Sequence, residues 1–371
     1  MPARLIKLTL SGFKSIKRLD GFEPGNLTVL IGPNGAGKSN LISFFRALSH
    51  MMSSPTGLQA HLTQTGKAHS WLHDGPGVTS AIDAALEIET DRGRNDYQFR
   101  LEFAAGDTLY FNYERFRFLP KGKRPDAPTN LGSGHGESRL FERAERGERT
   151  PSAIRDMLRK FINHQFHNTS FTSRMRQAWD ISDGRWLKED GANLAAVLYR
   201  LKSQEPLAPY YARIVQTIRQ SLPFFADFEL EPVAGQISLA WREGGTDSHF
   251  AAHQASDGML RFMALVTLLL QPANDLPDLL ILDEPELGLH PHAITTVAGL
   301  VQSVSFEKQV ILATQSATLL NQFAPEDVVV VERQGRESKF RRLDASELAA
   351  WLEQYSMGEL WEKNVFGGRP A

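Results

Sequence analysis

The chain has 371 residues and a formal net charge of −2, from 41 Lys and Arg against 43 Asp and Glu. This balance excludes a uniformly basic nucleic-acid coat but allows a local basic patch. The absence of cysteine excludes disulfides, Cys-ligated zinc, Cys-ligated iron–sulfur clusters and thiol nucleophiles. No apolar run approaches the roughly 18 residues of a membrane span, so we expect a soluble cytoplasmic protein with no membrane partner.

Apolar patterning predicts the first half of the chain as strands around one helix. We expect strands over 5–10 and 26–31, followed by a glycine-rich loop and a helix from Lys38 to Met51. Residues 53–80 are rich in Gly, Ser, Thr and Pro, which favours an irregular segment. Apolar and polar residues then alternate over 82–118, a pattern typical of an antiparallel meander.

The second half begins with an exposed loop over 120–150, which is charge-dense and carries Pro and Gly. The next helix is predicted to start at Thr150, an N-cap residue, with Pro151 in its first turn. Further helices are predicted over 191–203, 210–222, 258–270 and 291–303, and strands over 228–230, 237–241, 279–282, 310–313 and 328–331. The alternation of strand and helix in the last third predicts an α/β core.

A phosphate-binding pattern lies between the strand over 26–31 and the helix that begins at Lys38. Residues 32–39 read Gly-Pro-Asn-Gly-Ala-Gly-Lys-Ser and fit G-x-x-x-x-G-K-[ST] in full. Glycines let backbone N–H groups surround phosphates, aided by the helix N-terminus. We expect Lys38 to reach the β- and γ-phosphates of ATP and Ser39 to ligate Mg²⁺. The residues predicted to contact the nucleotide are Gly32, Pro33, Asn34, Gly35, Ala36, Gly37, Lys38, Ser39 and Asn40.

A second pattern predicts the metal and water side of the same site. The apolar residues 279–282 form a buried strand, and Asp283 and Glu284 follow it directly. A carboxylate at the carboxyl end of such a strand can hold the Mg²⁺ shell, the role expected for Asp283. We expect Glu284 to orient and polarise the attacking water as a general base.

Residues 254–261 read Gln-Ala-Ser-Asp-Gly-Met-Leu-Arg, a turn of small residues that opens an apolar helix. Together with the two patterns above, this resembles the ABC-type ATPases of the RecF/SMC branch, including OLD-like ATPases often assigned to the AAA family. The resemblance implies an α/β P-loop NTPase: an ABC/SMC-like head with an antiparallel β lobe and an inserted helical subdomain. It also implies that Ser256, Asp257 and Gly258 form a signature motif, which binds the γ-phosphate of ATP held by a second copy and so closes a homodimer.

Other segments follow the order of motifs in that branch. Residues 12–16 (Gly-Phe-Lys-Ser-Ile) resemble its N-terminal Phe-Lys-Ser motif, and residues 286–291 resemble the D-loop after the catalytic carboxylates. Gln315 stands where the family usually has a switch histidine; it keeps a hydrogen-bonding head without a positive charge, and we expect it near the γ-phosphate as a catalytic group. Gln64 is an open candidate for the Q-loop glutamine. The tail over 357–364 resembles the end of this subgroup, or is an ordinary amphipathic turn.

The resemblance divides the chain into an N-terminal part of the head (1–119), a loop and helical insert (120–227), a C-terminal part of the head (228–345) and a tail (346–371). Basic residues gather over 115–124 and 155–176 beside aromatic residues and could bind a phosphate backbone, although interspersed acids over 137–150 favour a solvated charged face there.

Two functions stay open. One is an ATPase of DNA repair or maintenance that binds DNA independently of sequence, and the other is an ATPase switch of a defence or toxin system that acts on an effector protein. A transporter ATPase is disfavoured by the Phe-Lys-Ser opening and the large insert.

Overall fold

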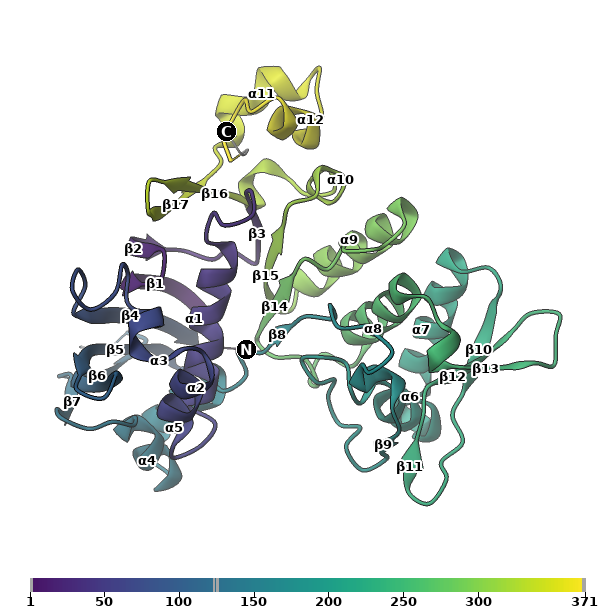
Figure 1. Cartoon of the computed structure of the whole chain (residues 1–371), viewed down its shortest axis with the longest axis horizontal. Helices are drawn as coiled ribbons and strands as arrows, with labels where there is room; N and C mark the ends of the chain where they lie inside the picture. Colours follow the sequence, from purple (N-terminus) through teal and green to yellow (C-terminus); the bar gives the residue numbers. More distant parts are fainter. Residues whose placement is uncertain (1–2, 123, 125–126, 369–371) are drawn as a thin grey trace.

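The computed structural model describes residues 3–122, 124 and 127–368. Within these residues, a six-stranded sheet forms the centre of the molecule, in the order β17-β16-β3-β15-β14-β8 (Figure 1). Neighbouring strands run parallel from β16 to β8, and β17 is antiparallel to β16. The strands are β3 (Leu27–Ile31), β8 (Asn163–His164), β14 (Leu279–Asp283), β15 (Gln309–Thr314), β16 (Val328–Gln334) and β17 (Glu337–Arg342).

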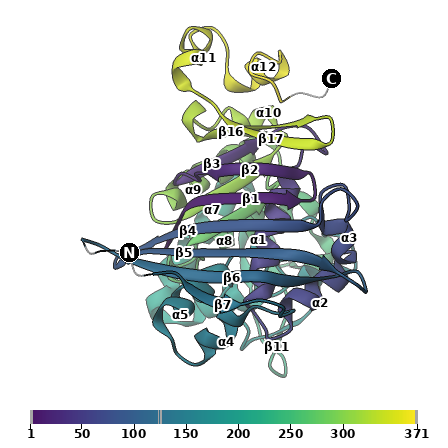
Figure 2. The ribbon, with the colours of Figure 1, turned by 90° about the vertical axis from the view of Figure 1, so that its left-hand side faces the viewer.

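A second sheet builds the β lobe, which Figure 2 shows face on. In the described part of the chain it has six antiparallel strands in the order β2-β1-β4-β5-β6-β7. They are β1 (Arg4–Phe13), β2 (Ile16–Phe22), β4 (Ala81–Thr90), β5 (Gly93–Ala104), β6 (Thr108–Pro120) and β7 (Thr129–Gly132). Apolar side chains of this sheet share one buried cluster with α1 (Lys38–Met51), α2 (Gly57–Gln64), α3 (Lys67–Trp71), α4 (Arg139–Glu145) and α5 (Arg149–Leu158).

The central sheet is covered on both faces. Along β14, Leu279 and Ile281 join the cluster with α1, whereas Leu280 and Leu282 join a second cluster formed with the helical lobe. Successive side chains of a strand point to opposite faces, so a strand buried on both sides needs the continuous apolar run seen here. The helical lobe contains α6 (Leu194–Ser203), α7 (Ala208–Ser221), α8 (Asp257–Leu270) and α9 (Pro291–Ser305), with short strands β9 (Trp179–Asp180), β10 (Phe225–Glu229), β11 (Gln236–Ile237), β12 (Ala240–Glu243) and β13 (His249–Ala251).

The remaining elements are short. The 3₁₀ turns are η1 (Arg174–Arg176), η2 (Glu205–Leu207), η3 (Ala252–Gln254) and η4 (Pro325–Asp327). The helix α10 (Ala317–Leu320) follows β15, and the chain continues through β16 and β17 to α11 (Ala345–Leu352) and α12 (Met357–Glu362), which cap the central sheet at one end (Figure 1). In the part of the chain that the structure describes, no helix combines the length and apolarity required to span a bilayer.

The predicted α/β P-loop fold is confirmed, whereas several local expectations were wrong. Residues 53–80 form α2 and α3 instead of an irregular segment, because Leu58 and Leu62 are buried in the β-lobe cluster and tertiary packing overrides the local composition. The helix predicted from Thr150 begins at Arg149, after Glu148. The division of the chain into parts stays a prediction; within the stretch 120–227, predicted as a loop and helical insert, apolar residues of the first part join the β-lobe cluster and those of the second part join the helical-lobe cluster.

Candidate nucleotide-binding site

Three neighbouring parallel strands bring the predicted motifs to one edge of the central sheet. β15 lies between β3 and β14, and the carboxyl ends of parallel strands meet at the same edge. Residues 32–40 follow β3, Asp283 ends β14, and Gln315 follows β15 directly. The fold therefore gathers the phosphate-binding loop, the two carboxylates and the switch residue, although they are far apart in sequence.

The phosphate-binding loop has the conformation that its glycines permit. Gly37 precedes α1 with φ 115°, and a Cβ there would overlap the side chain of Ser338. A Cβ on Gly32 would overlap the carbonyl oxygen of Val331 in β16. Lys38 is 5% exposed, and its Nζ donates to the carbonyl oxygens of Gly32 and Pro33, the latter at 3.1 Å. These two backbone carbonyl oxygens hold the ammonium group inside the loop, where we expect the phosphates to bind.

Burial sets the electrostatics of Lys38. It lowers the pKa of the ammonium group, and the carboxylates of Glu284, Asp283 and Glu286 oppose that shift. Ser39 and Asn34, in the same segment of the chain, are exposed. A buried cation next to exposed backbone amides is suited to binding a polyanion such as a nucleotide triphosphate.

The Phe-Lys-Ser motif supports this loop from its outer side. Ser15 Oγ accepts a hydrogen bond from Asn40 Nδ2 at 2.6 Å and another from Ser338 Oγ at 2.6 Å. Ser338 Oγ also lies 2.5 Å from the carbonyl oxygen of Ala36. Ser338, on β17, was not found from the sequence, because only the pairing of β17 with β16 brings it to the loop.

Asp283 presents an unpaired oxygen. The residue is 7% exposed, and among the described residues its Oδ1 has no hydrogen-bond partner, while Oδ2 accepts from Gln165 Nε2 at 3.4 Å. Burial is the main cause that raises the pKa of Asp283 to about 6, and the charge of Glu284 adds to it. A buried carboxylate oxygen without a donor fits a divalent cation, and Mg²⁺ commonly uses one or two protein ligands together with water and phosphate oxygens.

Glu284 and Glu286 are both held at the carboxyl end of β15, Glu286 by its last residue Thr314 and Glu284 by the next residue, Gln315. Glu284 has φ 46°, its N–H donates to Ala313, and its Oε1 accepts from Gln315 Nε2 at 2.8 Å. Glu286 Oε1 accepts from Thr314 Oγ1 at 2.5 Å, whereas Oε2 has no partner among the residues described. The predicted general base is therefore oriented by the predicted switch residue.

The predicted signature residues lie in the helical lobe. Ser256 caps α8 and its Oγ accepts from the N–H of Met259 at 3.2 Å; Ser256 and Asp257 are exposed. Asp257 pairs with Arg176 at 3.0 Å. A Cβ on Gly258 would overlap the carbonyl oxygen of Gly288 in the predicted D-loop. The signature thus contacts the D-loop, and a cavity of about 250 Å³ is lined by both.

Gln165 is a site residue that the sequence patterns missed. It follows β8, the edge strand beside β14, and reaches Asp283. Gln64, the candidate raised from sequence, is the exposed last residue of α2 in the β lobe. The segment after Gln165 is tied to the signature helix, because Arg261 donates to the carbonyl oxygens of Phe166 and His167.

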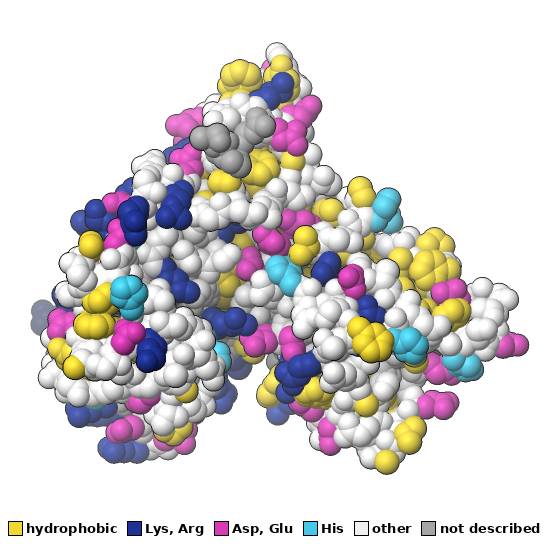
Figure 3. Space-filling view, viewed as in Figure 1, with side chains coloured by type: hydrophobic (Ala, Val, Ile, Leu, Met, Phe, Trp, Pro, Cys, Tyr) yellow, Lys and Arg dark blue, Asp and Glu magenta, His cyan; other side chains and the backbone are white. Residues whose placement is uncertain are grey.

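The basic residues expected to form one face are divided between the lobes and mostly paired. Arg117, on β6, pairs with Asp96 at 2.6 Å, whereas Arg174, on η1 in the helical lobe, pairs with Asp190 at 3.2 Å. Acidic and basic side chains are interspersed on the face drawn in Figure 3. Lys123, part of the predicted cluster, lies outside the described residues.

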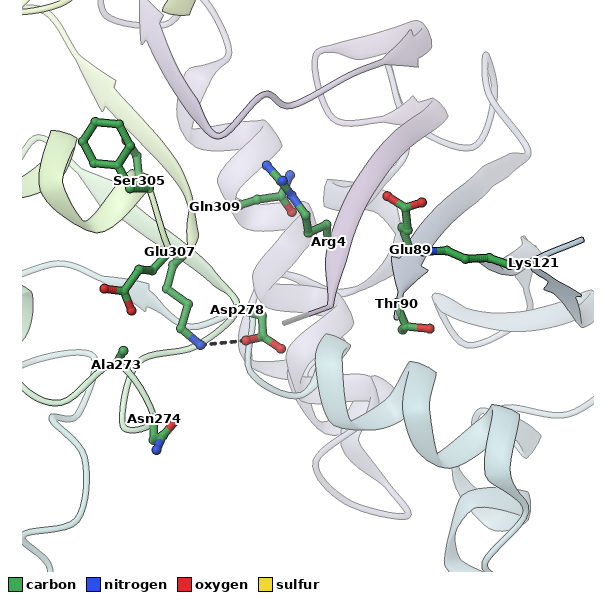
Figure 4. A pocket seen from close by; sticks show the side chains of 12 residues that line it. Arg4, Glu89, Thr90, Lys121, Ala273, Asn274, Asp278, Ser305, Glu307 and Gln309 are labelled. Atoms are coloured by element: carbon green, nitrogen blue, oxygen red, sulfur yellow. Dashed lines mark hydrogen bonds and ion pairs between the residues drawn. The ribbon is translucent and has the colours of Figure 1, made fainter. Parts of the chain in front are cut away.

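A larger cavity lies at the opposite edge of the central sheet. It has a volume of about 630 Å³ and is bordered by Arg4, by Asp278 just before β14 and by Gln309 at the start of β15 (Figure 4). Lys308 Nζ pairs with Asp278 at its border, at 2.8 Å. None of the residues predicted to bind the nucleotide or Mg²⁺ lines this cavity, so it has no part in the candidate nucleotide site.

The fold and this arrangement define a P-loop ATPase of the ABC/SMC-like type. The chain belongs to the family described as "AAA domain, putative AbiEii toxin, Type IV TA system", whose model matches residues 27–321. Among curated proteins, none matches the chain.

Two solved structures show the same fold. An SMC head bound to the C-winged helix domain of ScpA is similar with a TM-score of 0.59 and 15% identity, over 92% of this chain and 99% of that chain. An SMC head with an extended coiled coil, bound to the C-terminal domain of ScpA derived from Pyrococcus furiosus, gives 0.58 and 14%, over 95% and 99%.

Proposed function

We propose that this protein binds ATP with Mg²⁺ at the carboxyl edge of the central sheet and hydrolyses it. One observation carries the proposal: the Lys38 ammonium group, the unpaired oxygen of Asp283 and the carboxylate of Glu284 belong to one edge of neighbouring strands. These are the groups that phosphoryl transfer requires for phosphate binding, metal binding and water activation.

Each residue has a defined task in this proposal. Lys38 exchanges the carbonyl oxygens of Gly32 and Pro33 for phosphate oxygens when the nucleotide binds. Ser39 and Asp283 would hold Mg²⁺, which supplies charge neutralisation on the β- and γ-phosphates. Glu284 accepts a proton from water as the water oxygen bonds to the γ-phosphorus and the bond to the ADP oxygen breaks, which yields ADP and phosphate.

We further propose that ATP joins two copies of the chain. The exposed hydroxyl of Ser256 and the N-terminus of α8 are available to a phosphate, and they stand on the helical lobe while the phosphate-binding loop stands beside the β lobe. In a two-fold arrangement, Ser256, Asp257 and Gly258 of one copy would complete the site of the other. The decisive test is the mass in solution with and without ATP.

For the role of this ATP-dependent dimer, we propose two candidates. The first is DNA repair or maintenance, and the second is action on a protein partner in a toxin or defence system. The family description names a toxin and a TA system, and several arginines expected to bind DNA already form ion pairs. Both observations favour the protein partner. A gel shift with ATP and with a non-hydrolysable analogue, repeated over a range of salt, separates the two: no shift at low salt excludes DNA.

A further inference from the structure

The C-terminal residues 357–368 lie against two parts of the candidate site. Helix α12 packs on α10, the helix that begins directly after Gln315 and Ser316. Gly367 and Gly368 lie on β16, and Gly368 is also close to Ile31 at the end of β3. We propose that this segment, here called the C-terminal clamp, positions the phosphate-binding loop and Gln315 for ATP turnover. The proposal rests on the proposed ATPase function.

The first arm of the clamp is a direct backbone contact between α12 and α10. Gly358 N–H donates to Asn321 Oδ1 at 2.6 Å, and a Cβ on Gly358 would lie 2.7 Å from the carbonyl oxygen of Ala317. A Cβ does not approach an oxygen so closely in real proteins, so only glycine allows this contact. Since α10 is four residues long, it has little internal stability and depends on such packing.

A displacement of α10 would be transmitted to the catalytic carboxylate. Gln315 precedes Ser316, which caps α10 by accepting from the N–H of Leu319 at 3.2 Å. Gln315 in turn donates to Glu284. The first arm therefore affects the orientation of the general base Glu284 through Gln315, which lies two residues before the start of α10.

The second arm is closed by Gly368. Its N–H donates to Glu332 Oε1 at 2.8 Å, and its carbonyl oxygen accepts from Trp361 Nε1 at 2.9 Å. Gly367 and Gly368 have φ of 82° and 79°, a region that favours glycine, and a Cβ on Gly367 would overlap Glu332. Both backbone polar groups of Gly368 are thus fixed by side chains of β16 and α12.

Glu332 stands between two residues that contact the phosphate-binding loop. The carbonyl oxygen of Val331 lies 2.2 Å from the position that a Cβ of Gly32 would take, and Arg333 Nη1 donates to the carbonyl oxygen of Gly35 at 3.4 Å. The hairpin of β16 and β17 is therefore an intermediate layer between the clamp and the loop. A clamp that holds this hairpin and α10 together fixes the spacing of the phosphate-binding loop and Gln315.

The test compares matched glycine substitutions. Gly358→Ala forces α12 away from α10, whereas Gly299→Ala adds the same methyl group on α9, where no atom lies within 4 Å. We expect Gly358→Ala to lower kcat about tenfold with ATP affinity changed less than about twofold, since small displacements near reacting groups have large effects on rate. Gly299→Ala is expected to retain wild-type turnover. Asn321→Ala removes the hydrogen bond without added volume and covers the case in which Gly358→Ala does not fold.

The second arm is tested by Trp361→Phe, which removes the donor to Gly368 but keeps an aromatic ring. We expect the Kd of a fluorescent ATP analogue to rise about threefold to fivefold, the worth of one hydrogen bond. Hydrogen–deuterium exchange of peptides spanning 32–37 and 315–320 should rise in the clamp variants and stay unchanged in Gly299→Ala.

Hydrogen–deuterium exchange does not require ATP hydrolysis, so it tests the clamp independently of the ATPase activity. A wild-type protein that does not hydrolyse ATP would refute the proposed function and leave the test of the clamp intact. Clamp variants with a lower Tm but wild-type kcat, nucleotide Kd and exchange at both peptides would overturn the inference, because the segment would then be merely structural. Equal losses in Gly299→Ala would overturn it as well.

Discussion

Gln315 donates a hydrogen bond from Nε2 to Oε1 of Glu284, over 2.8 Å. The switch position is thus occupied by a neutral amide that contacts the carboxylate proposed to activate water. Glu284 is in the left-handed region and its N–H is bonded to Ala313, so its backbone is fixed and only the side chain needs a partner. Gln315 supplies that partner, which adds a positioning role to the γ-phosphate contact expected from the sequence.

Substitution of Gln315 should change turnover more than binding. Gln315→Ala removes one hydrogen bond from Glu284, and we expect kcat to fall about fivefold with ATP affinity nearly intact. Gln315→His should preserve or raise turnover, most clearly below about pH 6.5, where the imidazole becomes protonated and can stabilise negative charge. Phosphate release measured between pH 5.5 and pH 8 checks both. Wild-type rates for both variants over the whole range would mean that Gln315 has no catalytic role.

Lys38→Ala should abolish nucleotide binding, because Lys38 is the cation placed within the phosphate-binding loop. We expect the Kd for Mg-ATP to rise at least about a hundredfold and turnover to be lost. Lys67→Ala, on the exposed start of α3, is the matched control and should behave as wild type. Titration of a fluorescent ATP analogue measures the affinities, and unchanged turnover in Lys38→Ala would refute the ATPase assignment as a whole.

Glu284→Gln should trap the ATP-bound dimer. The amide keeps the hydrogen-bonding shape of the side chain but cannot accept a proton from water, so hydrolysis slows while Mg-ATP stays bound. Light scattering of this variant with ATP should give twice the monomer mass, and addition of Ser256→Arg should return it to the monomer. A monomer that persists at high protein and ATP concentrations would contradict the shared site.

The pKa of Asp283 predicts a pH dependence of metal binding. Burial and Glu284 raise this pKa to about 6, against the opposing charges of His167 and Lys38. Below pH 6 the carboxyl group is protonated, so Mg²⁺ must displace a proton and the affinity for Mg-ATP should fall about tenfold per pH unit. Calorimetry in buffers of different ionisation enthalpy should detect proton release near pH 6 and none near pH 8.

The raised pKa of Asp283 also predicts how the stability of the protein depends on pH. The pKa of Asp283 is higher in the folded protein than in the unfolded chain, so protonation of this carboxyl group stabilises the fold. This contribution to the free energy of unfolding is complete below about pH 4 and is lost as the pH rises through about 6. Without nucleotide and metal, Asp283→Asn should therefore be more stable than wild type at pH 8, by about 3 kcal/mol, and similar to it near pH 4. Urea unfolding at the two pH values measures the difference; equal effects at both would contradict the shifted pKa.

The motifs could be predicted because each is local in sequence. The loop over 32–39 and the carboxylates of Asp283 and Glu284 each lie within a few residues. Both follow predicted apolar strands, which indicated that they lie at the ends of strands. Gln165 could not be found, since β8 has only two residues and becomes a strand by pairing with β14. Ser338 reaches the phosphate-binding loop from β17, whereas Gly368 contacts Glu332 of β16. Both contacts depend on tertiary packing and have no short-range sequence pattern.

Gln165 and Gln64 give a direct comparison between a contact seen in the fold and a candidate raised from sequence. Gln165 donates to Asp283 at 3.4 Å, and the segment after it is held by Arg261 of the signature helix, so loss of its amide should loosen Asp283 and the link to α8. We expect Gln165→Ala to weaken Mg-ATP binding about threefold to tenfold and to lower turnover. Gln64→Ala, at the exposed end of α2, should match wild type in both measurements. Mg²⁺ titrations of ATP hydrolysis decide between them, and a loss in Gln64→Ala with none in Gln165→Ala would reverse the assignment.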